Sequence, residues 1–135
     1  MRMFTEVGRR AGMHCTAVGK VMLAAMLPDR AVEILRRSGL SAQTAHTLTT
    51  AEAMQEELAR IRENGYAMDE EEQEIGVRCV AVAIPGERAR AAISVSGPST
   101  RMTESLVGAA VPVLLETARA FGKELDLASV VAPGR

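Results

Sequence analysis

The sequence predicts a single α+β domain in which helices flank an antiparallel sheet. Two β-rich runs, at 77–84 and 89–96, lie close together with a Pro-Gly turn signal between them, which is typical of a hairpin. Segments of helical periodicity precede and follow this hairpin, and no strand-helix-strand alternation of a parallel sheet appears. At 135 residues, with 47% hydrophobic and 24% charged residues, the chain can bury one core.

The first half of the chain indicates a short strand followed by three helices. Thr16 is a plausible N-cap for the first helix, and Thr49 and Glu52 stand in capping-box register at the start of the third. A polar connection at 41–49 separates the second helix from the third. The strand is expected at 2–7, and the helices at 16–27, 29–37 and 49–64.

A long helix is expected at 103–125, followed by a frayed tail at 126–135. Pro112 should kink this helix, because proline cannot donate a hydrogen bond to the backbone ladder. One apolar side is expected to face the rest of the domain. It consists of Leu106, Ala110, Val113, Leu114, Thr117, Phe121 and Leu125.

Two charged features are interpreted as solvent-exposed. Residues 66–68 predict a short strand that runs into the acidic run at 69–72, and such runs are usually solvated. Gly19 and Lys20 do not complete a phosphate-binding loop, because His14 stands where the GxxxxGK pattern requires glycine. Lys20 is therefore predicted to be a solvated charge on the first helix.

Composition excludes several classes of function. Lys and Arg total 16 against 17 Asp and Glu, so the chain lacks the positive field that autonomous nucleic-acid binding requires. No apolar stretch approaches the roughly 20 residues needed to cross a bilayer, and no signal peptide is apparent, so a cytoplasmic location without membrane contact is expected. Cys15 and Cys79 lie far apart and form no CxxC pair, which favours reduced thiols.

Two local patterns could bind a polar ligand. The free amides at the start of the first helix, near Ala17 and Val18, could bind an anion, although ordinary capping by Thr16 with no ligand is the more common situation at a helix start. Because side chains alternate along a strand, Ser94 and Ser96 share one face, where they could bond a ligand or simply be solvated.

Enzymatic and metal-binding alternatives remain open at this stage. Cys79 shares a strand face with Val77, Ala81 and Ala83 and could be a buried, inert thiol, or a nucleophile with His14 or His46 as its base. Asp69 could pair with a following glutamate for acid-base work. A metal site built from His14, Cys15, Asp69 and Cys79 is conceivable, but no ligand spacing indicates one.

Four segments together resemble the C-terminal effector domain of IclR-type bacterial transcription regulators. Each is weak alone, whereas their order and spacing are specific, and the resemblance extends over residues 1–121. The segments are MHCTAVGKVMLA at 13–24, GYAMDEEE at 65–72, GVRCVA at 76–81 and AISVSGP at 92–98.

The resemblance implies a GAF-like (profilin-like) fold with a pocket for a small metabolite on one face of the sheet. It also implies dimers or tetramers, a small organic acid as effector, and no catalysis or cofactor. The pocket residues implied are Ala17, Val18, Asp69, Cys79, Ser94 and Ser96, with Met3 and Val77 as apolar walls.

The resemblance also implies segments that precede Met1 in such regulators. These are a winged helix-turn-helix, a linker helix, and further helix and strands of the effector domain. We therefore expect residues 1–125 to be a partial effector domain, and DNA to be contacted only through a domain absent from this sequence. Two alternative functions are a pure oligomerisation module and a hydrolase that depends on Cys79.

Overall fold

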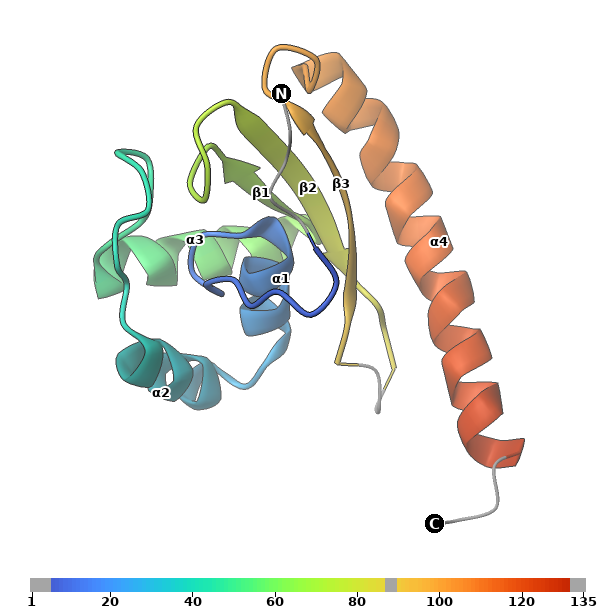
Figure 1. The fold of residues 1–135 in the computed structure, drawn as a ribbon. Coiled ribbons are helices and arrows are strands. Elements are labelled where there is room, and N and C mark those ends of the chain that lie inside the picture. The colour runs from blue at the N-terminus through green and yellow to red at the C-terminus, as the bar shows by residue number, and fades with distance from the viewer. Residues whose placement is uncertain (1–5, 87–89, 132–135) are drawn as a thin grey trace.

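The α+β architecture is confirmed by a computed structural model, which describes residues 6–86 and 90–131. A sheet of three strands lies between α1 and α3 on one side and the long helix α4 on the other (Figure 1). The elements are α1 (Ala17–Ala25), α2 (Pro28–Ser38), α3 (Ala51–Asn64), β1 (Ala67–Glu70), β2 (Val77–Ala83), β3 (Ala92–Pro98) and α4 (Glu104–Val131).

The sheet is antiparallel throughout, in the order β1-β2-β3. The hairpin expected from the two β-rich runs is confirmed as β2 and β3, and residues 87–89 of its turn lie outside the described residues. The register places Asp69 opposite Cys79, and Cys79 opposite Ser96. Because directly opposed residues point to the same face, these three side chains form one row across the sheet.

Side-chain caps mark the starts of α1 and α3. Thr16 is the N-cap of α1, as predicted, and its hydroxyl accepts a hydrogen bond from the Gly19 amide at 3.1 Å. The capping-box prediction for α3 is wrong by one residue, because Thr50 rather than Thr49 is the N-cap and accepts from the amide of Ala53. Two threonines adjoin here, and the sequence pattern alone did not distinguish them.

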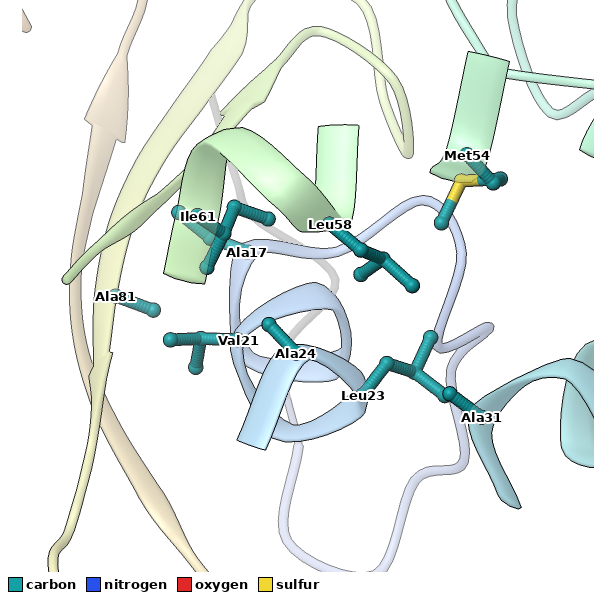
Figure 2. Close-up of a cluster of buried hydrophobic side chains, with 10 residues drawn as sticks. Ala17, Val21, Leu23, Ala24, Ala31, Met54, Leu58, Ile61 and Ala81 are labelled. Atoms are coloured by element: carbon teal, nitrogen blue, oxygen red, sulfur yellow. The ribbon is translucent and has the colours of Figure 1, made fainter. Parts of the chain in front are cut away.

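The core between α1, α3 and the sheet is apolar and largely aliphatic. Val21 and Ala24 of α1 face Leu58 and Ile61 of α3, and Ala81 of β2 closes the sheet side of this cluster (Figure 2). Spacings of three and four residues place these side chains on one face of each helix. The cluster holds α1 against the sheet, and so fixes the position of the helix start.

Helix α4 differs from its prediction in extent and in the face it buries. It continues beyond residue 125 to Val131, and it passes through Pro112. Leu114 is 8% exposed and packs on the sheet, whereas Val113 and Phe121, which were expected to face the domain, are 63% and 52% exposed. The cause is that α4 carries apolar residues on more than one side, so that periodicity alone does not select the packed side.

Part of α4, Glu104–Asp126, has the length and apolar composition of a membrane-crossing helix. Of its most apolar window 22% is buried, and Val107, Leu114 and Ala118 pack against Val80 and Val82 of β2. The strand expected at 2–7 falls mostly outside the described residues.

Candidate functional site

A cavity of about 670 Å³ opens on the α1 side of the sheet. The segment at 6–13, the first turn of α1, the loop after β1, and strands β2 and β3 enclose it. Seven of the residues singled out from the sequence line it, namely Ala17, Val18, Asp69, Val77, Cys79, Ser94 and Ser96. Met3, the remaining one, lies outside the described residues.

The first turn of α1 presents hydrogen-bond donors to this cavity. Thr16 uses its hydroxyl twice, donating to the Gly12 carbonyl oxygen at 2.8 Å and accepting from the Gly19 amide. Within the described part of the chain, the amides of Ala17 and Val18 have no hydrogen-bond partner. Capping by Thr16 therefore leaves two donors at the positive end of the helix dipole, where an anion would be stabilised.

Gly19 sets the shape of the wall beside this turn. A Cβ atom at position 19 would overlap the backbone of Met13, so only glycine lets the segment at 6–13 lie directly on α1. Met13 and Met22 line the cavity near this contact. Their flexible thioethers provide an apolar wall opposite the polar row of the sheet.

The floor of the cavity is the row of polar side chains across the sheet. Cys79 lies opposite Ser96, and Ser94 lies opposite Ala81 on the same face. Both serines are exposed, and β3 is the last strand of the described sheet. Their hydroxyls can therefore bond a polar ligand without first breaking a buried contact.

Asp69 brings a buried carboxyl group to the cavity. It is 3% exposed, and its Oδ1 accepts hydrogen bonds from the amides of Glu72 at 2.8 Å and Gln73 at 3.4 Å. Burial raises the pKa of Asp69 to about 6, and the charge of Glu72 adds to this shift, while the two amides and Lys20 oppose it. The carboxyl can thus accept a hydrogen bond from a ligand, and it titrates close to neutral pH.

The two thiols are poorly suited to nucleophilic chemistry. Burial raises the pKa of Cys79, the charges of Asp69 and Glu74 add to the shift, and a hydrogen bond with Ser96 opposes it. Burial likewise raises the pKa of Cys15 to about 11. His14 Nε2 donates to the Ser41 carbonyl oxygen at 2.8 Å, and His14 does not line the cavity. Since the thiolate is the reactive form, the arrangement disfavours a hydrolase based on Cys79.

Two charge predictions are wrong. Lys20 was expected to be solvated, yet it is 1% exposed and forms an ion pair with Glu72 at 2.9 Å. The acidic run at 69–72 was expected to be a solvated loop, yet Asp69 and Glu72 are buried. The reason is that Lys20 and Glu72 neutralise each other from positions far apart in the sequence, while the buried Asp69 accepts from the amides of Glu72 and Gln73.

Several residues that line the cavity were missed by the sequence analysis. Gln43 comes from the polar connection, Gln73 and Glu74 follow the acidic run, and Glu6 and Arg9 belong to the segment before α1. A polar loop that returns to the sheet gives no periodic signal, so only the three-dimensional arrangement identifies these residues. Within the described ranges, no cluster of three or more His, Cys, Asp or Glu side chains is suited to a metal ion.

Comparisons with known proteins agree with this geometry. The family model described as bacterial transcriptional regulator IclR C-terminal matches residues 1–123. The chain is similar to the transcriptional repressor IclR of Escherichia coli strain K12, with 39% identity over 109 residues, 79% of this chain and 40% of that protein. The chain spans less than half the length of the curated relatives it matches.

Solved structures are similar over most of the chain. The crystal structure of Thermotoga maritima IclR matches with a TM-score of 0.85 and 33% identity, over 91% of this chain and 51% of that chain. A double mutant of the PobR inducer binding domain from Acinetobacter, in complex with 3-hydroxy benzoic acid, matches with a TM-score of 0.80 and 28% identity, over 86% of this chain and 68% of that chain.

Proposed function

Because the chain belongs to the IclR family of bacterial transcriptional regulators and corresponds to their C-terminal domain, we propose that it senses a small organic acid. Binding of this effector would alter DNA binding by a separate domain of a longer regulator. The proposed binding residues are those that line the cavity, Ala17, Val18, Asp69, Val77, Cys79, Ser94 and Ser96, together with Met3.

One observation carries this proposal: the unpartnered amides of Ala17 and Val18 and the hydroxyls of Ser94 and Ser96 line the same cavity. A carboxylate can accept from the amides at one end while its oxo or hydroxyl group bonds the serines at the other. The inducer binding domain of PobR, a related fold, is described with a carboxylic acid bound. No aromatic side chain is among the described residues that line the cavity, which favours aliphatic acids.

The proposed mechanism is a population shift between quaternary arrangements. The cavity is enclosed by segments that are distant in sequence, so a ligand that contacts all of them would favour one arrangement of α1, the loop after β1 and the hairpin. A ligand can shift an equilibrium only by its difference in affinity for the two states. We propose that the two states are alternative dimers or tetramers of a cytoplasmic regulator, coupled to its DNA-binding domains.

The test is thermal unfolding of the purified chain with glyoxylate, pyruvate and longer oxo and hydroxy acids, since the cavity has room for more than a two-carbon ligand. Selective binding to the native state must raise the melting temperature; at a concentration 100 times the Kd, the stabilisation is about 2.7 kcal/mol. We expect a dose-dependent rise with at least one acid, which Ser94→Ala/Ser96→Ala should abolish.

Ser105→Ala is the matched control, because Ser105 is exposed on α4, on the other side of the sheet. It should leave the ligand-induced rise unchanged. If no acid stabilises the folded chain, the sensing proposal fails, and concentration-dependent dimer formation would then favour the oligomerisation module.

A further inference from the structure

The buried charge cluster behind the cavity joins three elements. Lys20 of α1 is one of the largest fully buried side chains. Its ammonium donates to both carboxylate oxygens of Glu72 at 2.9 Å, and to Oε1 of Glu57 in α3 at 3.0 Å. Although burial opposes ionisation, the Lys20 ammonium holds the pKa of Glu57 below its usual value. All three donors of the ammonium group are therefore used.

A buried ion pair such as Lys20 with Glu72 is weak evidence for a gain in stability. Removing charges from water is costly, and apolar residues of similar volume often replace a buried ion pair with no loss of stability. Lys20 lies on the buried side of α1, which also carries Ala17, Val21 and Ala24 of the aliphatic cluster. What an apolar residue would lack is directed bonding to Glu72.

Glu72 connects this ion pair to the cavity. Its carboxylate also accepts from the Glu70 amide at 3.0 Å, and its own amide donates to Oδ1 of Asp69 at 2.8 Å. Lys20 follows Ala17 by one turn of α1. The same helix thus presents amides to one wall of the cavity and, through Lys20 and Glu72, contacts the turn that follows β1, whose Glu72 amide donates to Asp69 on another wall.

The turn itself needs to be held. Glu71 has a φ angle of 58°, in the left-handed region that non-glycine residues rarely adopt, at a cost of about 1 kcal/mol or more. Thr47 and Thr44 donate to the carbonyl oxygens of Glu72 and Glu71, at 2.6 and 2.7 Å. A strained backbone persists only where its surroundings over-determine it, and the ion pair with Lys20 is the charged part of those surroundings.

We propose that Lys20 is a positioning residue for the cavity: its ion pair with Glu72 holds the turn at 71–73, directly after β1, against the start of α1. The pair thereby fixes where the Asp69 carboxyl lies relative to the amides of Ala17 and Val18. The consequence for ligands rests on the proposed function, whereas the positioning of the turn does not.

The test is amide hydrogen exchange in Lys20→Met/Glu72→Gln. This variant removes both charges, keeps an acceptor oxygen for the Glu70 amide, and fills the Lys20 site with an apolar chain of similar length. We expect the amides at positions 72 and 73, which donate to Asp69, to exchange at least about tenfold faster, while β2 amides remain protected as in the parent. Unchanged protection at 72 and 73, or an equal loss across β2, would overturn the proposal.

Glu57→Gln is the matched control, because it alters the other carboxylate bound to Lys20 and leaves the bond to Glu72 in place. It should leave exchange at positions 72 and 73 unchanged; a tenfold increase there would contradict a specific role for Glu72. If the double variant does not fold, Glu72→Ala replaces it, since Lys20 then retains Glu57 as a counter-charge, and the same amide at position 73 decides the outcome.

Calorimetric titration with glyoxylate and pyruvate tests the consequence for ligand affinity. If the parent binds either acid, the double variant should bind at least about tenfold more weakly, and Glu57→Gln should bind as the parent does. Equal affinity in the double variant would overturn the ligand consequence. If the parent binds no acid at all, the proposed function fails, while the exchange experiment still decides whether Lys20 positions the turn.

Discussion

The two faces of strand β2 differ in their surroundings: one packs against an apolar helix and the other lines a polar cavity. On the α4 face, Val80 and Val82 are fully buried against an apolar helix surface, and the charged group nearby, Arg78, bonds Glu70 and Glu104 at the rim. On the α1 face, Val77 and Cys79, which alternate with these residues, line a polar cavity.

The difference shows how one strand can separate packing from the proposed binding of a ligand. Period-two alternation gives each face its own chemistry, so that the α4 face can be packed without voids while the α1 face keeps a cavity and buried charges. Buried titratable groups cluster on the cavity side, at Lys20, Asp69 and Glu72. Substitutions on the two faces should therefore change different measurable properties.

The largest change in the free energy of unfolding is expected from a substitution between α4 and β2. Leu114→Ala should lower the free energy of unfolding by about 2–5 kcal/mol, because it leaves a void between α4 and β2. The neighbouring Val113→Ala should change it by about 0.5 kcal/mol or less, since Val113 is exposed. Urea unfolding measures both. Equal losses for the two variants would mean that α4 packs on the side expected from its sequence pattern.

A substitution on the cavity face is expected to raise the free energy of unfolding rather than lower it. The pKa of Asp69 in the folded chain, about 6, is above its ordinary value, so the fold favours the protonated carboxyl. The contribution of Asp69 to stability therefore falls as the pH rises from about 4 to 6 and is constant above that, with a maximum loss of about 3 kcal/mol. Asp69→Asn should accordingly stabilise the chain at pH 7.5 and have little effect below pH 4.

Unfolding curves of Asp69→Asn at several pH values between 4 and 7.5 would check this. Glu74→Gln is a suitable control, because it makes the same charge change at the half-buried edge of the same cavity and should show a much smaller gain. A loss of stability at pH 7.5 in Asp69→Asn would show that the amide bonds to Oδ1 outweigh the burial of charge.

The smallest effect is expected at Cys79. Cys79→Ser is nearly isosteric and should change the free energy of unfolding by about 1 kcal/mol or less. Because burial raises the pKa of this thiol, Cys79 should react slowly with iodoacetamide at pH 7. Mass spectrometry of the alkylated chain would follow the reaction. Rapid labelling of Cys79 would favour the hydrolase hypothesis and contradict the proposal that this face of β2 only binds a ligand.

Local signals predicted much of the fold and part of the site. Thr16 as a cap and the pairing of β2 with β3 follow from a few adjacent residues. The common face of Ser94 and Ser96 follows from period two alone. That these serines meet Ala17 and Asp69 in one cavity was implied only by the resemblance to a family, since no local pattern connects residues so distant in sequence.

The failures at Lys20, at the acidic run and at α4 arise from contacts that form only in the folded chain, unlike the one-residue error at the cap of α3. Lys20 and Glu72 are 52 positions apart, so neither residue's neighbours reveal that the other neutralises it. The buried side of α4 depends likewise on which of its apolar sides meets Val80 and Val82, and the helix sequence offers more than one. Long-range compensation of charge and the choice between similar apolar faces are properties of the folded chain, and composition does not encode them locally.

The close contact between Gly19 and the backbone of Met13 limits how the cavity can diversify. Any other residue at position 19 would push away the wall that Met13 carries, so the backbone there is fixed. The side chains at positions 13 and 22 have no such restriction, and both are unbranched thioethers that smaller or larger apolar residues can replace. Substitutions at positions 13 and 22 could thus change the size of ligand that the cavity accepts, while the backbone of the segment at 6–13 and the amide donors of α1 stay in place.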